Sequence, residues 1–134
     1  MGPADFITRA RGIRRMLGGT MRQAGVIAAA GLVALEHMVD RLAEDHARAR
    51  RLHQGLRAIH PAWCAAELPQ TNIVQVRVGT SAADARLWEA RLAEAGVLVR
   101  TGSAGLLRLV THRHIDDKAV DSTLQTFTRL HHDN

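Results

Sequence analysis

The segment from Met21 to about His37 is apolar on nearly every side, and this feature constrains the fold most strongly. Valine, isoleucine, leucine and alanine follow one another over positions 26–35 with almost no polar interruption. A surface helix would show one apolar stripe and one polar face. We therefore expect a helix that is buried or pressed between subunits, since contiguous exposed apolar surface usually marks an interface. The run is too short to span a bilayer, which takes about 20 residues.

An arginine- and glycine-rich stretch, Arg14–Gly25, precedes this helix. Thr20 and Gln23 have the spacing of a capping box, which predicts that the helix begins directly after Thr20. The unpaired amides and the positive dipole end of such a helix favour an anion. Arg15 and Arg22 would supply the countercharge, and the glycine pair between them would allow close approach. The stretch thus predicts an anion site, with an ordinary capped helix and solvated arginines as the alternative.

The remainder of the chain predicts an α+β layer. Helices are expected over residues 5–17, 40–60, 82–95 and 116–131, and strands over 72–78, 97–99 and 106–111. A turn at residues 102–105 should join the last two strands into a hairpin. We expect a small, mainly antiparallel sheet with helices on one face, preceded by two linking helices. This organisation divides the chain into residues 1–37 and residues 38–134.

The composition excludes several classes of protein. An apolar content of 46% argues against disorder. The net charge of +5 could suit a polyanion, but acids are interleaved with the bases and only 3% of residues are aromatic, so we expect no nucleic-acid partner. The single cysteine, Cys64, is interpreted as a small buried hydrophobe, and it fits a reducing, cytoplasmic compartment.

The eight histidines do not predict a metal centre. His46, His53 and His60 recur every seven residues along one helical segment. Residues seven apart are separated by about 10 Å of helix rise, so no two of them could share one ion. His112 and His114 are closer, but they follow a strand end and are interpreted as a turn feature. We therefore expect no metal.

Arg108 is the most informative single residue. It interrupts the apolar run 106–111, and a guanidinium group cannot remain buried without a partner. Its planar fork of donors suits a carboxylate bound through two hydrogen bonds. The alternative is an arginine on an edge strand whose head reaches water.

Five motifs in order along the chain carry a family resemblance. They are R-R-M-L-G-G-T-M-R-Q-A-G at 14–25, A-A-A-G-L-V-A-L-E-H at 28–37, R-L-A-E-D-H-A-R-A-R-R-L at 41–52, Q-T-N-I-V at 70–74 and R-L-V-T-H at 108–112. Together they resemble the C-terminal part of the low-specificity L-threonine aldolases. These are pyridoxal-phosphate enzymes of the aspartate-aminotransferase-like fold, fold type I. The resemblance extends over nearly the whole chain.

The resemblance implies a fold and a function. Residues 38–134 would be the C-terminal small domain, and residues 1–37 would link it to an N-terminal large domain that binds pyridoxal 5'-phosphate and is missing here. The complete enzyme would be a cytoplasmic homo-oligomer. It would cleave β-hydroxy-α-amino acids, threonine or allo-threonine, to glycine and an aldehyde. The alternative is an inactive remnant or interaction module that keeps only the small-domain fold.

The resemblance also implies roles for single residues. Arg108 would bind the α-carboxylate of the amino-acid substrate, and Arg22 and Arg15 would lie beside the cofactor phosphate, reached across a subunit interface. Thr20 departs from the family, which usually has a third glycine there. The lysine that carries the cofactor as a Schiff base belongs to the missing segment, and Lys118, the only lysine here, does not match it. We therefore expect no catalytic residue in this chain and no activity from it alone.

Overall fold

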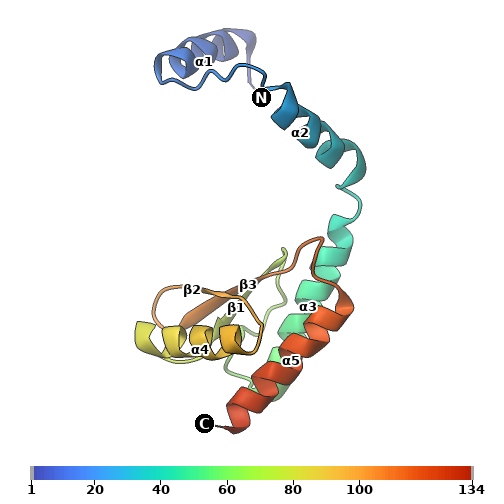
Figure 1. Ribbon diagram of the computed structural model, residues 1–134, viewed down its shortest axis with the longest axis vertical. Coiled ribbons are helices and arrows are strands. Elements are labelled where there is room, and N and C mark those ends of the chain that lie inside the picture. Colours follow the sequence, from blue (N-terminus) through green and yellow to red (C-terminus); the bar gives the residue numbers. More distant parts are fainter. Residues whose placement is uncertain (1, 134) are drawn as a thin grey trace. The chain divides into compact units, whose positions relative to one another are not determined.

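The computed structural model describes residues 2–133 and divides the chain into two compact units, residues 1–39 and residues 40–134 (Figure 1). The first unit holds two helices, α1 (Ala4–Met16) and α2 (Gly25–His37). Neither contains a buried residue. Among the described helices, none is long and apolar enough to cross a membrane.

The glycine pair between these helices forms the end of α1. Gly18 adopts a left-handed φ of 75°. Its amide donates to the Arg15 carbonyl oxygen at 3.2 Å, and the Gly19 amide donates to the Arg14 carbonyl oxygen at 2.8 Å. This pair of bonds is the Schellman motif, in which a glycine in the left-handed region closes a helix. The glycines therefore terminate α1, as the sequence predicts.

The predicted start of α2 is wrong. The helix begins at Gly25, four residues later than expected, and its N-cap, Ala24, has no side-chain cap bond. Gln23 has a left-handed φ of 52°, so it cannot occupy the third helical position that a capping box with Thr20 requires. Residues 22–24 form a turn instead, so the helix start expected directly after Thr20, on which the predicted anion site depends, does not form there.

The second unit is the α+β domain that the sequence predicts. Its elements are α3 (Leu42–Ile59), β1 (Ile73–Arg77), α4 (Ala82–Glu94), β2 (Arg100–Thr101), β3 (Leu106–Val110) and α5 (Asp117–His132). The sheet order is β1-β3-β2, and both pairs are antiparallel. Helices α3 and α5 pack side by side, and α4 lies against the β2 and β3 strands (Figure 1).

Alternation along the strands separates a buried face from an exposed face. Val74 and Val76 of β1 and Leu107 and Leu109 of β3 are buried beneath the helices, whereas the residues between them are exposed. The helices contribute a core of large side chains, among them Leu56, Leu92, Trp88, Val120 and Phe127. Burying each such side chain stabilises the fold by about 1.5–3 kcal/mol. The helices expected over residues 40–60, 82–95 and 116–131 thus each bury one face.

The predicted strand over residues 97–99 is wrong, and β2 comprises only Arg100 and Thr101. Gly96 has a φ of 82° and ends α4 as expected. The Val97 amide then donates to the Leu92 carbonyl oxygen at 2.8 Å, which keeps the chain close to the helix. Pairing with β3 consequently starts only at Arg100.

Caps define the starts of the last two helices. Asp116 accepts a hydrogen bond from the Ala119 amide at 2.8 Å and caps α5. At α4 the cap is Ser81, which forms a capping box with Asp84. Hydrogen bonds to Asp84 from the Ser81 and Thr80 amides, together with one from the Ser81 hydroxyl, lower the pKa of this carboxyl.

Candidate functional site

Arg108 lies on the central strand, β3, and its side chain is on the exposed face of the sheet. It is therefore not an edge-strand residue. Its partner in register on β1 is Gln75, and its partner on β2 is Arg100. Directly opposite residues of antiparallel strands project to the same face. Gln75, Arg108 and Arg100 consequently form one row across the face that the helices leave open.

A hollow of about 340 Å³ lies on this face. It is lined by Leu98, Val99, Arg100, Arg108, Val110 and His112. Neither of its arginines has a side-chain hydrogen bond or ion pair with another residue between positions 2 and 133. The lining contains three basic side chains and no acid, so the hollow is suited to an anion.

His112, the third basic side chain, ends the R-L-V-T-H motif. Its Nδ1 accepts a hydrogen bond from the His114 amide at 3.3 Å. A neutral imidazole that accepts at Nδ1 carries its proton on Nε2. His112 therefore keeps one N–H donor that this turn does not use.

Hydrogen bonds between three motifs hold the strand that carries Arg108. The Thr111 hydroxyl, which is buried, donates to the Asp45 carbonyl oxygen of α3 at 2.7 Å. The Asn72 side-chain amide donates to the Thr111 carbonyl oxygen at 2.6 Å, and the Thr111 amide donates to the Asn72 carbonyl oxygen at 3.0 Å. The ends of β1, β3 and α3 are thereby joined three residues from Arg108.

The Asp45 carboxylate is fixed on the other side of this junction. Arg41 donates to its two oxygens at 2.7 and 3.0 Å, and the Asp45 side chain is almost completely buried. This bidentate hydrogen bond is the main reason that the pKa of Asp45 is lowered, and burial opposes the effect. The charge on Arg48 lowers the pKa further. The Asp45 carboxylate is therefore already paired with Arg41.

The opposite end of the strand is held by the hairpin loop. Gly105 has a φ of 77°, and a Cβ there would lie 2.1 Å from the Gly79 carbonyl oxygen, so only glycine fits. Its carbonyl oxygen accepts from the Val78 amide at 2.9 Å. The Arg77 guanidinium donates to the Ala104 carbonyl oxygen at 3.1 Å. Arg77 thus shares the exposed face with Arg108, but its side chain is engaged.

Arg15 and Arg22 belong to the first unit. Arg15 is in the last turn of α1, and Arg22 is in the turn that leads to α2. Both side chains are exposed, and neither has a hydrogen bond or ion pair with another described residue. The chain thus offers unpaired cations on either side of the Schellman turn. Their role at a cofactor phosphate stays a prediction, as does the role of Arg108 at a substrate carboxylate.

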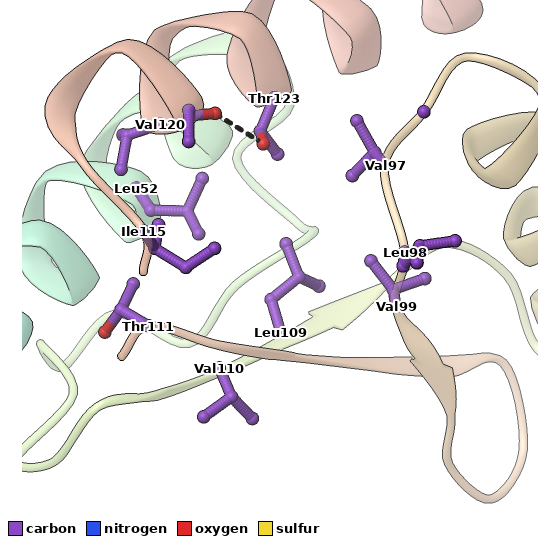
Figure 2. Close-up of a pocket in the computed structure, with 12 residues that line it drawn as sticks. Leu52, Val97, Leu98, Val99, Leu109, Val110, Thr111, Ile115, Val120 and Thr123 are labelled. Atoms are coloured by element: carbon purple, nitrogen blue, oxygen red, sulfur yellow. Dashed lines mark hydrogen bonds between the residues drawn. The ribbon is translucent and has the colours of Figure 1, made fainter. Parts of the chain in front are cut away.

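A second cavity, of about 150 Å³, lies between α5, β3 and the segment 97–99 (Figure 2). Figure 2 shows Leu52, Leu109, Val120 and other apolar side chains around it. Its two threonine hydroxyls already donate elsewhere, that of Thr111 to Asp45 and that of Thr123 to the Ala119 carbonyl oxygen at 2.9 Å or less. The cavity thus lacks polar groups that could direct chemistry, and we interpret it as a packing gap of the core.

The described residues form neither a metal site nor a reactive cysteine, and their lysine lies outside the hollow. No group of three or more His, Cys, Asp or Glu side chains there could hold a metal ion. Cys64 is buried, and this burial raises the pKa of its thiol to about 11, so the thiolate is scarce at neutral pH. Lys118 lies exposed in the first turn of α5 and does not line the hollow.

Sequence reasoning missed two residues of the hollow, Arg100 and His112. Arg100 was not predicted to lie in the site because the strand was expected over residues 97–99. Its register with Arg108 depends on the residue at which pairing begins. The signal that could have found it is the hairpin itself. Once a turn at 102–105 is assumed, the basic residue just before it faces the strand that contains Arg108.

Comparison with known proteins places the chain in a family. The profile of the beta-eliminating lyases matches residues 1–79. A probable low-specificity L-threonine aldolase 2 of Arabidopsis thaliana is 37% identical over 133 residues, which cover 98% of this chain and 38% of that protein. The low specificity L-threonine aldolase of Escherichia coli strain K12 is 42% identical over 112 residues, which cover 84% of this chain and 32% of that protein. The chain thus spans about a third of the length of these curated relatives.

Solved structures show the same fold. The serine palmitoyltransferase of Sphingomonas wittichii superposes with a TM-score of 0.65 and 31% identity, over 79% of this chain and 28% of that one. The ornithine aminotransferase of Toxoplasma gondii superposes with a TM-score of 0.53 over 75% of this chain and 27% of that one, and at 22% identity it supports the fold alone. Since the family profile covers more than half of its residues, this chain belongs to the beta-eliminating lyase family.

Proposed function

We propose that this chain is the C-terminal portion of a pyridoxal-phosphate-dependent lyase of the L-threonine aldolase type. In complete form the enzyme would cleave β-hydroxy-α-amino acids such as threonine or allo-threonine to glycine and an aldehyde, in the cytoplasm. Family membership and the similarity to two named threonine aldolases support this proposal. The observation that carries it is Arg108, an unpaired guanidinium group in a basic hollow on the open face of the sheet.

Arg108 would bind the α-carboxylate of the substrate. Its fork of donors matches the two oxygens of a carboxylate and fixes the orientation of the amino acid about its α-carbon. The strand around it is held at Thr111 by Asp45 and Asn72, and at Gly105 by the hairpin. A rigid strand is a better platform than a loop for this task, because small misplacements of a substrate lower the rate steeply.

The residues of this chain fit one part of a pyridoxal 5'-phosphate site, the part that would hold the phosphate. Arg15 and Arg22 are exposed cations without partners in the described chain, as a phosphate would require. No described residue matches the lysine that would attach the cofactor covalently, because Lys118 lies at the start of α5 and outside the hollow. When bound, the cofactor acts as an electron sink for the substrate's α-carbon. The chain would contribute binding and orientation, and its partner would contribute the lysine.

The first unit would provide the contacts with that partner, either an N-terminal large domain or a second subunit. Val26, Ile27, Leu32, Val33 and Leu35 of α2 are between 53% and 79% exposed. Contiguous apolar surface of this kind is typical of an interface. The same surface supports the alternative function, an interaction module that keeps the small-domain fold without catalysis.

A chimera tests the proposal. Residues 1–134 replace the matching segment of the Escherichia coli aldolase, and release of glycine from allo-threonine is measured. We expect turnover, because the cofactor lysine then comes from the bacterial part. A folded chimera that binds pyridoxal 5'-phosphate but releases no glycine would contradict the proposal and favour the interaction module. The unmodified bacterial enzyme is the positive control.

A further inference from the structure

We propose that Arg100 and Arg108 form a two-cation site for a ligand with two negative groups. Within the proposed enzyme, and dependent on that proposed function, the site would bind β-hydroxy-α-amino acids whose side chain carries a second anionic group more tightly than neutral substrates such as allo-threonine. Arg108 would hold the α-carboxylate and Arg100 the second anion. Neither the family resemblance nor the comparisons assign a role to Arg100.

The register of the hairpin carries this inference. Arg100 of β2 stands directly opposite Arg108 of β3 in an antiparallel pair, so their Cβ atoms are separated by about 4.5–5.5 Å and their side chains share one face. Like charges in this position destabilise a sheet. Both residues are nevertheless exposed and without a side-chain partner in the described chain. A bound dianion would remove the repulsion between them.

The residues around the two arginines favour the binding of an anion over that of a cation or a neutral ligand. Of the six residues that line the hollow, three are basic and none is acidic. The nearby carboxylate of Asp45 is held by Arg41 and is not one of the lining groups. Gln75, on the other side of Arg108, adds a neutral amide to the same row.

The spacing of the arginines selects a class of ligand. Two guanidinium groups that start from neighbouring strands can each bind one carboxylate when the carboxylates are joined by a short chain of two or three carbons. Leu98, Val99 and Val110 provide an apolar lining for such a linker. A dicarboxylate can place one carboxylate on each arginine and so supply a charge to both, whereas a monocarboxylate brings a single negative charge to the pair.

Binding of simple carboxylates to the 134-residue chain tests the proposal. Succinate and acetate are titrated at constant ionic strength, so that general screening does not change, and backbone amide chemical shifts of β2 and β3 are followed by NMR. We expect succinate to bind about tenfold more tightly than acetate. Arg100→Gln should reduce the succinate affinity to that of acetate, and Arg100→Lys should restore part of the preference.

Arg77→Gln is the matched control, because Arg77 lies on the same open face but donates to Ala104. It should leave the preference for succinate unchanged. Equal affinities for succinate and acetate, or a preference that survives in Arg100→Gln, would overturn the proposal. The proposed function is tested separately by glycine release in the chimera. An inactive chimera together with Arg100-dependent succinate binding would contradict the function and leave the two-cation site in place.

Discussion

The hydroxyl of Thr111 donates to the backbone carbonyl of Asp45 at 2.7 Å, and this bond joins residues that are 66 positions apart. One comes from the R-L-V-T-H motif and the other from the R-L-A-E-D-H stretch. Asn72 of Q-T-N-I-V completes the junction through its amide. Three of the motifs that carry the family resemblance therefore meet at one point, where they fix the strand of Arg108 against α3.

This junction predicts the effect of Thr111→Val. The substitution keeps the side-chain shape but leaves the buried Asp45 carbonyl without this donor, so we expect the free energy of unfolding to fall by about 1–3 kcal/mol. The melting temperature should fall by roughly 4–8 °C per kcal/mol for a domain of this size. Thr123→Val is the matched control, since that hydroxyl bonds only within its own helix. Equal melting temperatures for the two variants would contradict the role of the junction.

Asp45 predicts the dependence of stability on acid. Its pKa is lowered in the folded chain, chiefly by the hydrogen bonds from Arg41. Its contribution is therefore fully present above the unfolded value of about 3.9, and it is lost as the pH falls through the lower folded value. We expect Asp45→Asn to be less stable than the wild type at pH 7, and the difference between the two urea unfolding curves to shrink as the pH falls below the unfolded value. A difference that stays constant on acidification would assign the effect to packing instead.

The position of Lys118, the only lysine in the sequence, predicts that the isolated chain does not bind the cofactor covalently. With Lys118 outside the hollow, the isolated chain should not develop stoichiometric visible absorbance on titration with pyridoxal phosphate. Dialysis should then remove the cofactor completely. An absorbance band of one equivalent that disappears in Lys118→Ala would show that the attachment site lies in this chain.

Helix α2 predicts self-association of the free chain. Its exposed apolar side chains have no cover within the described residues, so light scattering should show a mass above 14.6 kDa that rises with concentration. Val33→Asp should shift the distribution towards the monomer. Leu98→Asp, at a residue that is 86% exposed in the second unit, should leave it unchanged. A wild-type chain that stays monomeric at high concentration would contradict the interface.

Much of the second unit could be predicted from local patterns. Val74 and Val76 alternate with exposed residues, and the buried residues of α3 recur with the helical period. Both patterns come from burial of one face of the element, and such periodicity is visible in the sequence. The start of α2 could not be predicted, because the T-x-x-Q box competed with a Schellman turn two residues earlier. Only the backbone of Gln23 decides between them.

The composition of the hollow could not be predicted fully, because it depends on longer-range geometry. Arg108 stands out in an apolar strand and was singled out from the sequence, whereas Arg100 lines the hollow only because of the register of the hairpin. That register depends on the left-handed Gly105 and on the bond between Val97 and Leu92, neither of which has a strong local signal. The pairing of Thr111 with Asp45 joins distant segments, so no local pattern could reveal it.

The most direct test of the central claim is the kinetics of Arg108→Lys in the chimera with the Escherichia coli aldolase. Lysine keeps the charge but removes the fork, and losing charge-assisted hydrogen bonds of about 1.5–3 kcal/mol should lower kcat/KM for allo-threonine roughly tenfold to hundredfold. The affinity for pyridoxal phosphate should stay the same, and Arg77→Lys should change neither quantity. Unchanged kinetics in Arg108→Lys, with only the melting temperature lowered, would show that Arg108 is a structural residue of the sheet and would contradict the account.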